Sequence, residues 1–390
     1  MVHMDVIIIG AGPAGLSLAN SLANINLKVL VVEKQSKKKI ANPDYDGREI
    51  ALTHFSKKIL KEIDIWKYFS DNDISSIKEA KVLDGNSPYA LHFDRKAVST
   101  EALGYIISNQ KIKKALYNKL IKQKNIEIIY ETEIQKILFK DQSSVIKLSN
   151  NKVLRTSLLI AADSRFSKTR EMAGISTQFN DFKRVAIVAR MRHEKPHNNI
   201  AYECFHYGET LAILPLNKNI SSIVMTIPKD KSSMFLSINK NQFNKYISDK
   251  FKNKFGKMNL IDKRFSYPLV SVFADKFVSN NFALIGDAAV GMHPVTAHGF
   301  NLGLRGQHAL YKQIKQAVNL GLNIGSPVIL EKYQLKHYRS CKPLYLATNS
   351  IVKLYTDESM ISKIARKAVL RIGNNFFLAK QQIINQLTEI

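Results

Sequence analysis

Short apolar runs and a glycine-rich turn alternate over the first 33 residues of the chain. Residues 5–9 and 28–32 are apolar and rich in β-branched side chains, which is typical of buried parallel strands. Between these runs, apolar side chains recur at helical spacing, at positions 16, 19, 22 and 23. The pattern predicts a strand–helix–strand unit whose first turn spans residues 10–15.

The pattern changes farther along the chain. From about residue 184 to residue 273 it predicts a second, mainly antiparallel sheet, which is a candidate for the substrate side of the protein. The other main elements expected are a hairpin of 79–83 with 89–93, a helix over 110–124, a strand ending at 162, a strand at 282–285 and helices over 301–320 and from 329.

The composition predicts a sizeable core and room for two domains, since 45% of the 390 residues are hydrophobic. No apolar run approaches the ~20 residues that a membrane span needs. The first strand begins too early to leave room for a signal peptide. Cys204 and Cys341 are the only cysteines, so we expect no disulfide framework and a location in the reducing cytoplasm.

The chain is strongly basic, with 58 Lys and Arg against 32 Asp and Glu, a formal net charge of +26. Three explanations stay open: the base composition of an AT-rich genome, attraction to an anionic membrane surface, and nucleic-acid binding. No nucleic-acid motif supports the third. A basic amphipathic helix expected over residues 360–372 either lies on a membrane or packs with its basic face in solvent.

Residues 10–15, GAGPAG, fit the pattern G-x-G-x-x-G between two strands. Gly10 permits the tight turn, Gly12 lets a pyrophosphate approach the backbone, and Gly15 lets the helix pack closely. The helix N-terminus then attracts the phosphates. Glu33 ends the second strand, where it can accept hydrogen bonds from a ribose and would repel a 2′-phosphate. The motif predicts binding of FAD or NAD and does not separate the two.

Three further polar sites follow predicted strands or loops. Gly286 and Asp287 end the strand at 282–285, and Asp287 can hydrogen-bond sugar-alcohol hydroxyls there. Asp163 follows another strand end, where ligands gather in α/β sheets. Arg48 follows a flexible loop, so its guanidinium either contacts a flavin or phosphate or forms a surface ion pair.

Taken together, three motifs resemble those of the flavin-dependent aromatic hydroxylases of the para-hydroxybenzoate hydroxylase fold, in the branch that acts on ubiquinone precursors. The motifs are GAGPAG with Glu33, LIAADSRFSKTR at 159–170 and FALIGDAAVGMHPVTAHGFNLGL at 282–304. The resemblance covers nearly the whole chain. It implies an α/β fold: a Rossmann-like FAD-binding domain with an inserted, mainly antiparallel β-sheet substrate domain and a helical C-terminus.

Two departures from the family pattern are informative. Ser164 stands where the second motif usually has glycine, and residues 296–299, Thr-Ala-His-Gly, replace the usual Ala-Gly-Gln-Gly. With the stretch HYGETLAILPLN at 206–217, they are similar to the 5-demethoxyubiquinol 5-hydroxylase subgroup. This resemblance implies hydroxylation at C5, with C1 and C6 as alternatives.

The resemblance implies a division of the chain into four parts. Residues 1–180 form the first part of the FAD-binding domain, with a small β excursion at about 78–95. Residues 181–275 form the substrate sheet, residues 276–330 the second part of the FAD-binding domain, and residues 331–390 the C-terminal helices.

The resemblance also implies residue roles at matching positions. FAD contacts are expected from Gly10, Gly12, Pro13, Ala14, Gly15, Glu33, Lys34, Arg48, Asn109, Asp163, Gly286, Asp287, Pro294, Gly299, Asn301 and Leu302. Candidates for catalysis near the ring are Arg48, His54, Tyr207, His293 and His298.

The implied activity is that of an FAD-dependent monooxygenase acting through a C4a-hydroperoxyflavin, with NAD(P)H or another reductant as electron donor and no metal. Its implied partners are O₂, a prenylated quinol or phenol and other ubiquinone-biosynthesis proteins, at the surface of the inner membrane and without nucleic acid. Alternatives are hydroxylation of another phenolic substrate, or reduction of prenyl double bonds by the same fold. A non-enzymatic adaptor is a further alternative, against which the intact motifs argue.

Overall fold

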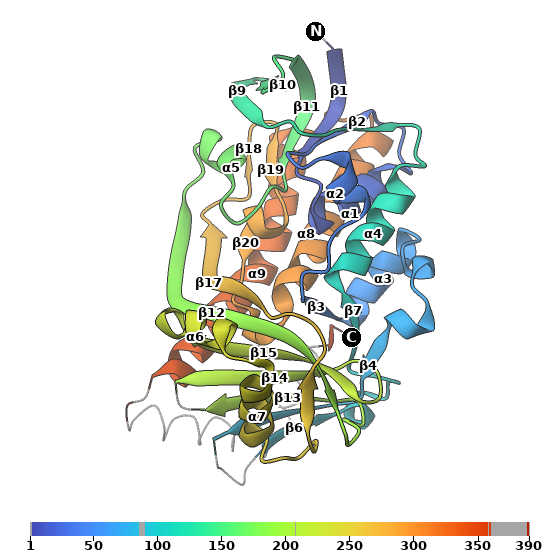
Figure 1. Cartoon of the computed structure of the whole chain (residues 1–390). Coiled ribbons are helices and arrows are strands. Elements are labelled where there is room, and N and C mark those ends of the chain that lie inside the picture. The colour runs from blue at the N-terminus through green and yellow to red at the C-terminus, as the bar shows by residue number, and fades with distance from the viewer. Residues whose placement is uncertain (1, 86–89, 207, 358, 360–387, 390) are drawn as a thin grey trace.

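The computed structural model describes residues 2–85, 90–206, 208–357, 359 and 388–389. Within this part of the chain, one large sheet lies above another in Figure 1, and a small sheet lies between them at one side. The small sheet has the order β3 (Glu49–Leu52), β7 (Gly104–Ser108) and β4 (Ser75–Ile77). The basic helix expected over 360–372 lies outside the described residues.

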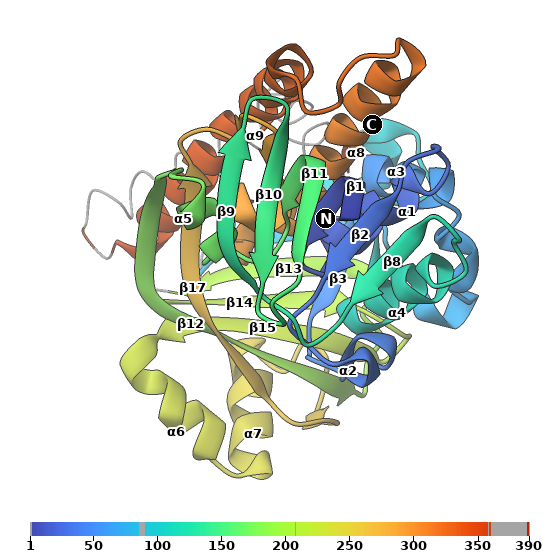
Figure 2. The ribbon, with the colours of Figure 1, turned by 90° about the horizontal axis from the view of Figure 1, so that it is seen from above.

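The upper sheet is built on parallel strands, which lie side by side in Figure 2. Its order is β18 (Val278–Ser279), β19 (Phe282–Leu284), β11 (Val153–Ala161), β1 (Val2–Ile9), β2 (Val29–Val32) and β8 (Ile126–Ile129). Two antiparallel strands, β9 (Ile134–Lys140) and β10 (Ser143–Leu148), extend from β11. The central strands are buried on both faces, which explains their unbroken apolar sequences.

Helices cover this sheet and confirm the predicted strand–helix–strand unit. The long ones are α1 (Pro13–Leu22), α4 (Asn109–Leu120), α8 (His298–Asn319) and α9 (Pro327–Thr356). Shorter ones are α2 (Lys37–Ala41), α3 (His54–Glu62) and α5 (Lys168–Met172). Both α4 and α8 pack on α1, so the apolar side chains of α1 are buried between the sheet and two helices.

The lower sheet is mainly antiparallel, as predicted. Its order is β20 (Val290–Gly291), β17 (Phe265–Ala274), β12 (Thr177–His193), β15 (Ile220–Pro228), β14 (Glu209–Pro215), β13 (Ile200–His206), β5 (Glu79–Asp84) and β6 (Ala90–Asp94), with β16 (Met258–Leu260) beside β12. The predicted hairpin of 79–93 belongs to this sheet, because its first strand, β5, pairs in parallel with β13. The four-part domain division stays a prediction.

The two faces of the lower sheet have different neighbours. Side chains such as Tyr202 and Cys204 point to a core that includes Phe243 and Ile247 of α7 (Lys240–Lys250), beside α6 (Ser232–Ser237). The opposite face is directed toward the upper sheet, and Tyr267 on β17 shows this, since its hydroxyl donates a hydrogen bond to the carbonyl of Asp46. The period-2 alternation of strand side chains separates these two environments.

One strand is longer than the sequence pattern indicated. The sequence pattern placed the start of this sheet at about residue 184, whereas β12 begins at Thr177 and runs for 17 residues. The first half of β12, around the exposed Phe179, is mostly polar and exposed, and its register shifts between Asp181 and Arg184. It therefore lacks the alternation of buried and exposed residues from which a strand is predicted. In Figure 1 this long strand runs down from beside α5 to the lower sheet.

A buried histidine fixes the contact between α8 and α9. His337 on α9 is 2% exposed, and its ring lies against the backbone of Gly306, where a Cβ would come within 2.5 Å of Nε2. Burial, with a smaller effect of Arg305, lowers the pKa of His337 to about 3. The helices therefore pack only around the neutral imidazole.

We expect acid to destabilise the protein through this residue. The unfolded chain protonates His337 near pH 6.5, whereas the folded chain does so only near pH 3, so stability falls as the pH falls through this window. The slope from this group is about 1.4 kcal/mol per pH unit. Urea unfolding between pH 7.5 and 5.5 should show a shallower loss for His337→Gln than for the wild type. The exposed control His3→Gln should keep the wild-type slope.

Candidate functional site

The glycine-rich turn has the geometry of a phosphate-binding loop. Gly10 has φ +108°, which favours glycine, and a Cβ on Gly15 would lie 2.0 Å from the carbonyl oxygen of Gly10. Gly12 caps the N-terminus of α1, and Pro13 is its first helical residue. A Cβ on Gly12 would have no described atom within 4 Å. The turn therefore leaves open space in front of the helix N-terminus.

Glu33 ties the end of β2 to this turn. One carboxylate oxygen accepts a hydrogen bond from the amide of Ala11 at 2.6 Å, and the other accepts one from the amide of Gln35 at 2.8 Å. The residue is 6% exposed, whereas Lys34 beside it is exposed. The carboxylate thus lies at the carboxyl end of the strand, next to the open space.

Three corners that are far apart in the sequence meet here. Gly286 has φ +59°, and a Cβ on it would lie 2.8 Å from the Cβ of Ala14. A Cβ on Gly10 would lie 2.6 Å from the carbonyl of Ala162, which precedes Asp163. The predicted dinucleotide turn, the Asp163 corner and the Asp287 corner therefore line one region.

The two aspartates of these corners differ in their partners. Asp287 accepts two hydrogen bonds from the guanidinium of Arg165, at 3.1 and 2.8 Å. Asp163 accepts bonds from Thr169 through Oδ2, at 3.1 Å from the hydroxyl and 3.4 Å from the amide. The Oδ1 of Asp163 is buried, and no described residue hydrogen-bonds it. This oxygen is ready to accept a hydrogen bond from a ligand.

Arg48 forms an ion pair, which is one of the two roles that its position in the sequence predicted. Its guanidinium donates to Asp46 at 2.6 and 3.1 Å and lies over the ring of Tyr267, with 5.4 Å to the centroid. Asn109 donates to the same carboxylate at 2.7 Å. Burial raises the pKa of Asp46, but the bonds from Arg48 and Asn109 outweigh it and leave the pKa below its usual value. The carboxylate of Asp46 thus holds Arg48 and Asn109, and the Tyr267 hydroxyl donates to the backbone carbonyl of the same residue.

The loop before α8 contains His293, whose buried imidazole is neutral. His293 accepts a hydrogen bond from the amide of Val295 and meets the ring of Phe182 edge-on at 4.8 Å. Burial lowers its pKa to about 4, with smaller effects of Arg184 and Arg165. Its Nε2 is buried, and none of the residues in the described part of the chain bonds it.

The remaining candidates follow in the same loop and on α3. Pro294 is exposed, and a Cβ on Gly299 would meet no described atom within 4 Å. Leu302 is buried in the first turn of α8. His54 lies elsewhere, at the start of α3, and donates from Nε2 to the carbonyl of Ala102 at 2.8 Å. Tyr207 lies outside the described residues.

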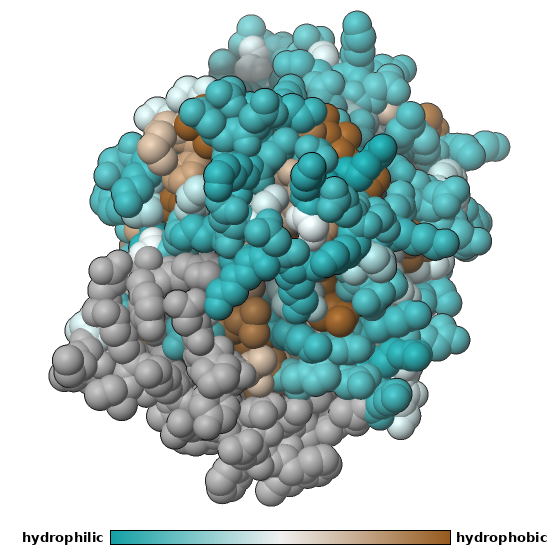
Figure 3. Space-filling view, turned by 60° about the horizontal axis from the view of Figure 1, so that its bottom comes forward, coloured by the Kyte–Doolittle hydropathy of each residue, from teal (hydrophilic) through white to brown (hydrophobic). Residues whose placement is uncertain are grey.

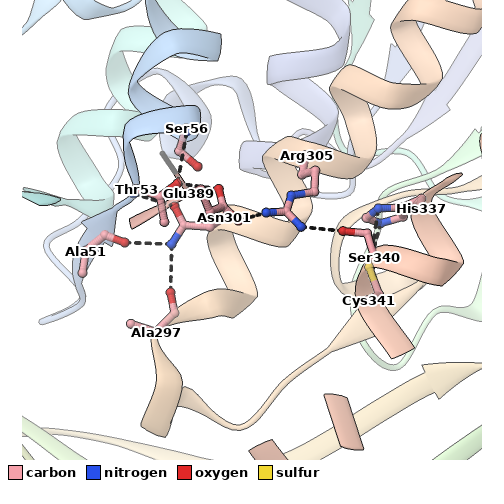
Figure 4. A network of polar contacts seen from close by, with 10 residues as sticks. All are labelled: Ala51, Thr53, Ser56, Ala297, Asn301, Arg305, His337, Ser340, Cys341 and Glu389. Atoms are coloured by element: carbon pink, nitrogen blue, oxygen red, sulfur yellow. Dashed lines mark hydrogen bonds and ion pairs between the residues drawn. The ribbon is translucent and has the colours of Figure 1, made fainter. Parts of the chain in front are cut away.

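A polar network fixes the first turns of α8 and α3, as Figure 4 shows. Asn301 donates to the carbonyls of Ala51 and Ala297 and accepts from the amide of Thr53. The Thr53 hydroxyl donates to Glu389 at 2.7 Å, and Glu389 pairs with Arg305 on α8. The network joins the end of β3, α8 and the carboxyl-terminal part of the chain.

Two residues in this region were not among the candidates from the sequence. Asp46 joins Arg48 and Asn109, and Arg165 spans from the second motif to Asp287. Asp46 could have been suspected because it directly precedes the predicted Arg48 segment. The partner of Arg165 is 122 residues away, and no local pattern indicates it.

Comparisons with known proteins agree with this geometry. The family described as FAD binding domain matches residues 3–336. Ubiquinone hydroxylase UbiM of Neisseria meningitidis is 43% identical over 99% of this chain and 85% of its own length. Ubiquinone hydroxylase UbiL of Rhodospirillum rubrum is 30% identical over 95% of this chain and 86% of its own. The chain belongs to the family of flavin-dependent ubiquinone-biosynthesis hydroxylases.

The fold is also that of solved flavoproteins. The structure of p-nitrophenol 4-monooxygenase from Pseudomonas putida has a TM-score of 0.79 at 15% identity and covers 100% of this chain and 99% of its own. The α/β fold of FAD-dependent hydroxylases expected from the motifs is therefore confirmed. The cofactor of this hydroxylase is FAD, and its activity is that of an aromatic monooxygenase.

FAD fits the residues that line the region. The open space at Gly12 accommodates a pyrophosphate at a helix N-terminus, and the Asp163 Oδ1 can accept a hydrogen bond from the cofactor. Glu33 lies where a ribose would follow the pyrophosphate, although its two oxygens already accept backbone amides. The contacts of individual residues with FAD stay predictions.

Gly12→Ala should separate cofactor binding from folding. Its φ of −73° suits alanine and the added methyl meets open space, so the free energy of unfolding of the apoprotein should change by less than about 0.5 kcal/mol. FAD affinity should fall roughly tenfold or more, because the methyl keeps phosphate from the backbone amides. Gly15→Ala should destabilise the apoprotein itself. Wild-type FAD affinity in Gly12→Ala, measured by flavin fluorescence, would contradict this assignment.

The Arg305–Glu389 pair should slow the release of FAD by holding Thr53 and Asn301 in place. We expect Arg305→Gln and Glu389→Gln each to speed FAD release roughly threefold or more, because each removes a charge-assisted hydrogen bond. The double variant should release FAD no faster than either single variant, since both lose one shared contact. The exposed control Arg339→Gln should behave like the wild type, and additive effects would refute the coupling.

Proposed function

We propose that this enzyme hydroxylates the aromatic ring of a prenylated ubiquinone precursor, with C5 of demethoxyubiquinol as the position attacked. Support for the substrate class comes from the 43% identity with ubiquinone hydroxylase UbiM, which extends over the lower sheet as well as the FAD corners. Support for C5 comes from Ser164 and the residues around His298, where the chain departs from the wider family. Positions C1 and C6 are the alternatives.

The observation that carries the proposal is the meeting of the three FAD corners opposite a face of the lower sheet. Bound FAD, once reduced by NAD(P)H or another donor, supplies the activation of O₂ for transfer of one oxygen atom. The residues of the chain hold the cofactor, keep the ring of the substrate close and exclude water. His293 stays neutral at pH 7, so it adds no positive charge beside Arg165 and Arg184.

Access from a membrane is part of the proposal, because a prenylated substrate is a lipid. The structure contains no helix with the length and hydrophobicity of a membrane span among its described residues. The coloured part of the face drawn in Figure 3 is mainly hydrophilic, with small and separate hydrophobic patches. We therefore propose that the net charge of +26 attracts the enzyme to an anionic membrane surface. Other ubiquinone-biosynthesis proteins are proposed partners.

Complementation tests the position of hydroxylation. A bacterial host that lacks only the hydroxylase acting on demethoxyubiquinol should regain ubiquinone when it expresses this chain, and demethoxyubiquinone should disappear from its mass-spectrometric quinone profile. Gly12→Ala, expressed to the same level, serves as the FAD-weakened control. Persistent demethoxyubiquinone in this host, together with rescue of a host that lacks only its C1 or C6 hydroxylase, would overturn C5, and an unchanged profile in all three hosts would overturn the substrate class.

A further inference from the structure

His293 and His197 are equally buried histidines whose rings are held in the same way. Each is 3% exposed. In each ring, Nδ1 accepts a hydrogen bond from the backbone amide two residues farther along the chain, at 3.2 Å from Val295 and at 2.9 Å from Asn199. A backbone amide can only donate, so Nδ1 carries no proton in the neutral imidazole. Each ring therefore presents an N–H donor at Nε2.

The two histidines differ in what this donor meets. His197 donates from Nε2 to the carbonyl of Asn217 at 2.7 Å. The Nε2 of His293 is buried as well, and no residue in the described part of the chain accepts a hydrogen bond from it. A buried donor without an acceptor is costly, and most such groups in folded proteins have a partner. The Nε2 of His293 is therefore a place where a ligand can supply the acceptor.

The charges around His293 favour an electron-rich oxygen as that acceptor. Arg165 and Arg184 lie near enough to the ring to lower its pKa. The chain holds both guanidinium groups in place, Arg165 by Asp287 and Arg184 by a hydrogen bond to the carbonyl of Gly208 at 2.7 Å. Asp287 offsets part of this positive charge. A neutral N–H donor near two fixed cations attracts an oxygen with partial negative charge, such as that of a phenol or quinol.

The ring of His293 is also next to the long strand of the lower sheet. It meets the ring of Phe182 on β12 edge-on, with 4.8 Å between the ring centroids. Phe182 in turn lines a cavity of about 390 Å³ between β12 and α9, to which Leu346 and Val352 contribute apolar side chains. The donor thus lies one side chain away from room for an apolar group. A ligand with a ring oxygen and an apolar chain suits this neighbourhood.

We propose that the Nε2–H group of His293 donates a hydrogen bond to a ring oxygen of the prenylated phenol or quinol and thereby positions the ring for hydroxylation. The proton stays on Nε2, so His293 binds and orients the substrate without acting as an acid or a base. FAD is the rival acceptor, because Pro294 beside this residue is an expected cofactor contact. The inference rests on the proposed function, which gives the substrate its ring oxygen.

Two substitutions of His293 separate the Nε2 donor from the turn at Nδ1. His293→Asn keeps an oxygen that can accept the amide of Val295, as asparagine does at helix N-caps, but it has no donor at the position of Nε2. His293→Gln reaches that position with an amide N–H donor. If the donor binds substrate, His293→Gln should recover what His293→Asn loses. If only the turn matters, His293→Asn should be the better tolerated of the two.

Binding of ortho-prenylphenol to the FAD-loaded enzyme, followed by the change in flavin absorption, measures the effect. The dissociation constant should rise roughly tenfold in His293→Asn and return to within about threefold of the wild type in His293→Gln. The matched control His197→Asn should keep the wild-type constant, because it removes a donor whose acceptor belongs to the chain. Prenylbenzene, which lacks the ring oxygen, should bind His293→Asn and the wild type equally. FAD affinity should stay at the wild-type value in all three variants.

Three results would overturn the proposal for His293. The first is wild-type affinity for ortho-prenylphenol in His293→Asn. The second is an equal loss in His293→Asn and His293→Gln, which would indicate a structural role. The third is a loss of FAD affinity with unchanged binding of the phenol, which would assign the donor to the cofactor. A wild-type enzyme that binds neither ortho-prenylphenol nor prenylbenzene would instead overturn the proposed substrate class.

Discussion

The close approach of Gly286 to Ala14 is the constraint on which the rest of the site depends. A Cβ at Gly286 would lie 2.8 Å from that of Ala14, and its φ of +59° also favours glycine. This contact lets the strand–helix corner after β19 meet the corner after β1. Because β11 lies between these strands, the Asp163 corner joins them. One dinucleotide can therefore contact three motifs that are far apart in the sequence.

The parts of this arrangement that depend on local sequence could be predicted. Residues 10–15 specify their own turn, and the apolar runs around them specify two buried strands. The contacts that complete the site are long-range: Arg165 reaches Asp287, and β5 pairs with β13. Nothing in the sequence near Arg165 distinguishes it from a surface arginine. Such contacts arise from the packing of whole sheets, which periodicity does not encode.

The lower sheet shows how strand alternation serves function. Its outer face packs on α7 and supplies the apolar core that a stable sheet needs. Its inner face is therefore free to carry side chains chosen for other reasons, such as Thr210, Thr226 and Tyr267. A shift of register by one residue would bury these groups under α7 and turn the apolar core toward the cofactor. The same pairing that stabilises the sheet thus determines what the substrate meets.

The carboxylates around the site differ in whether the chain itself supplies their hydrogen-bond partners or leaves an oxygen able to accept another bond. Glu33 is satisfied by two backbone amides, Asp46 by Arg48 and Asn109, and Asp287 by Arg165. Each of these holds two parts of the chain together. The Oδ1 of Asp163 is buried without a partner among the described residues. A buried carboxylate oxygen without a partner is a place where a ligand can supply the missing hydrogen bond, and Asp163 has such an oxygen at the corner between the two other motifs.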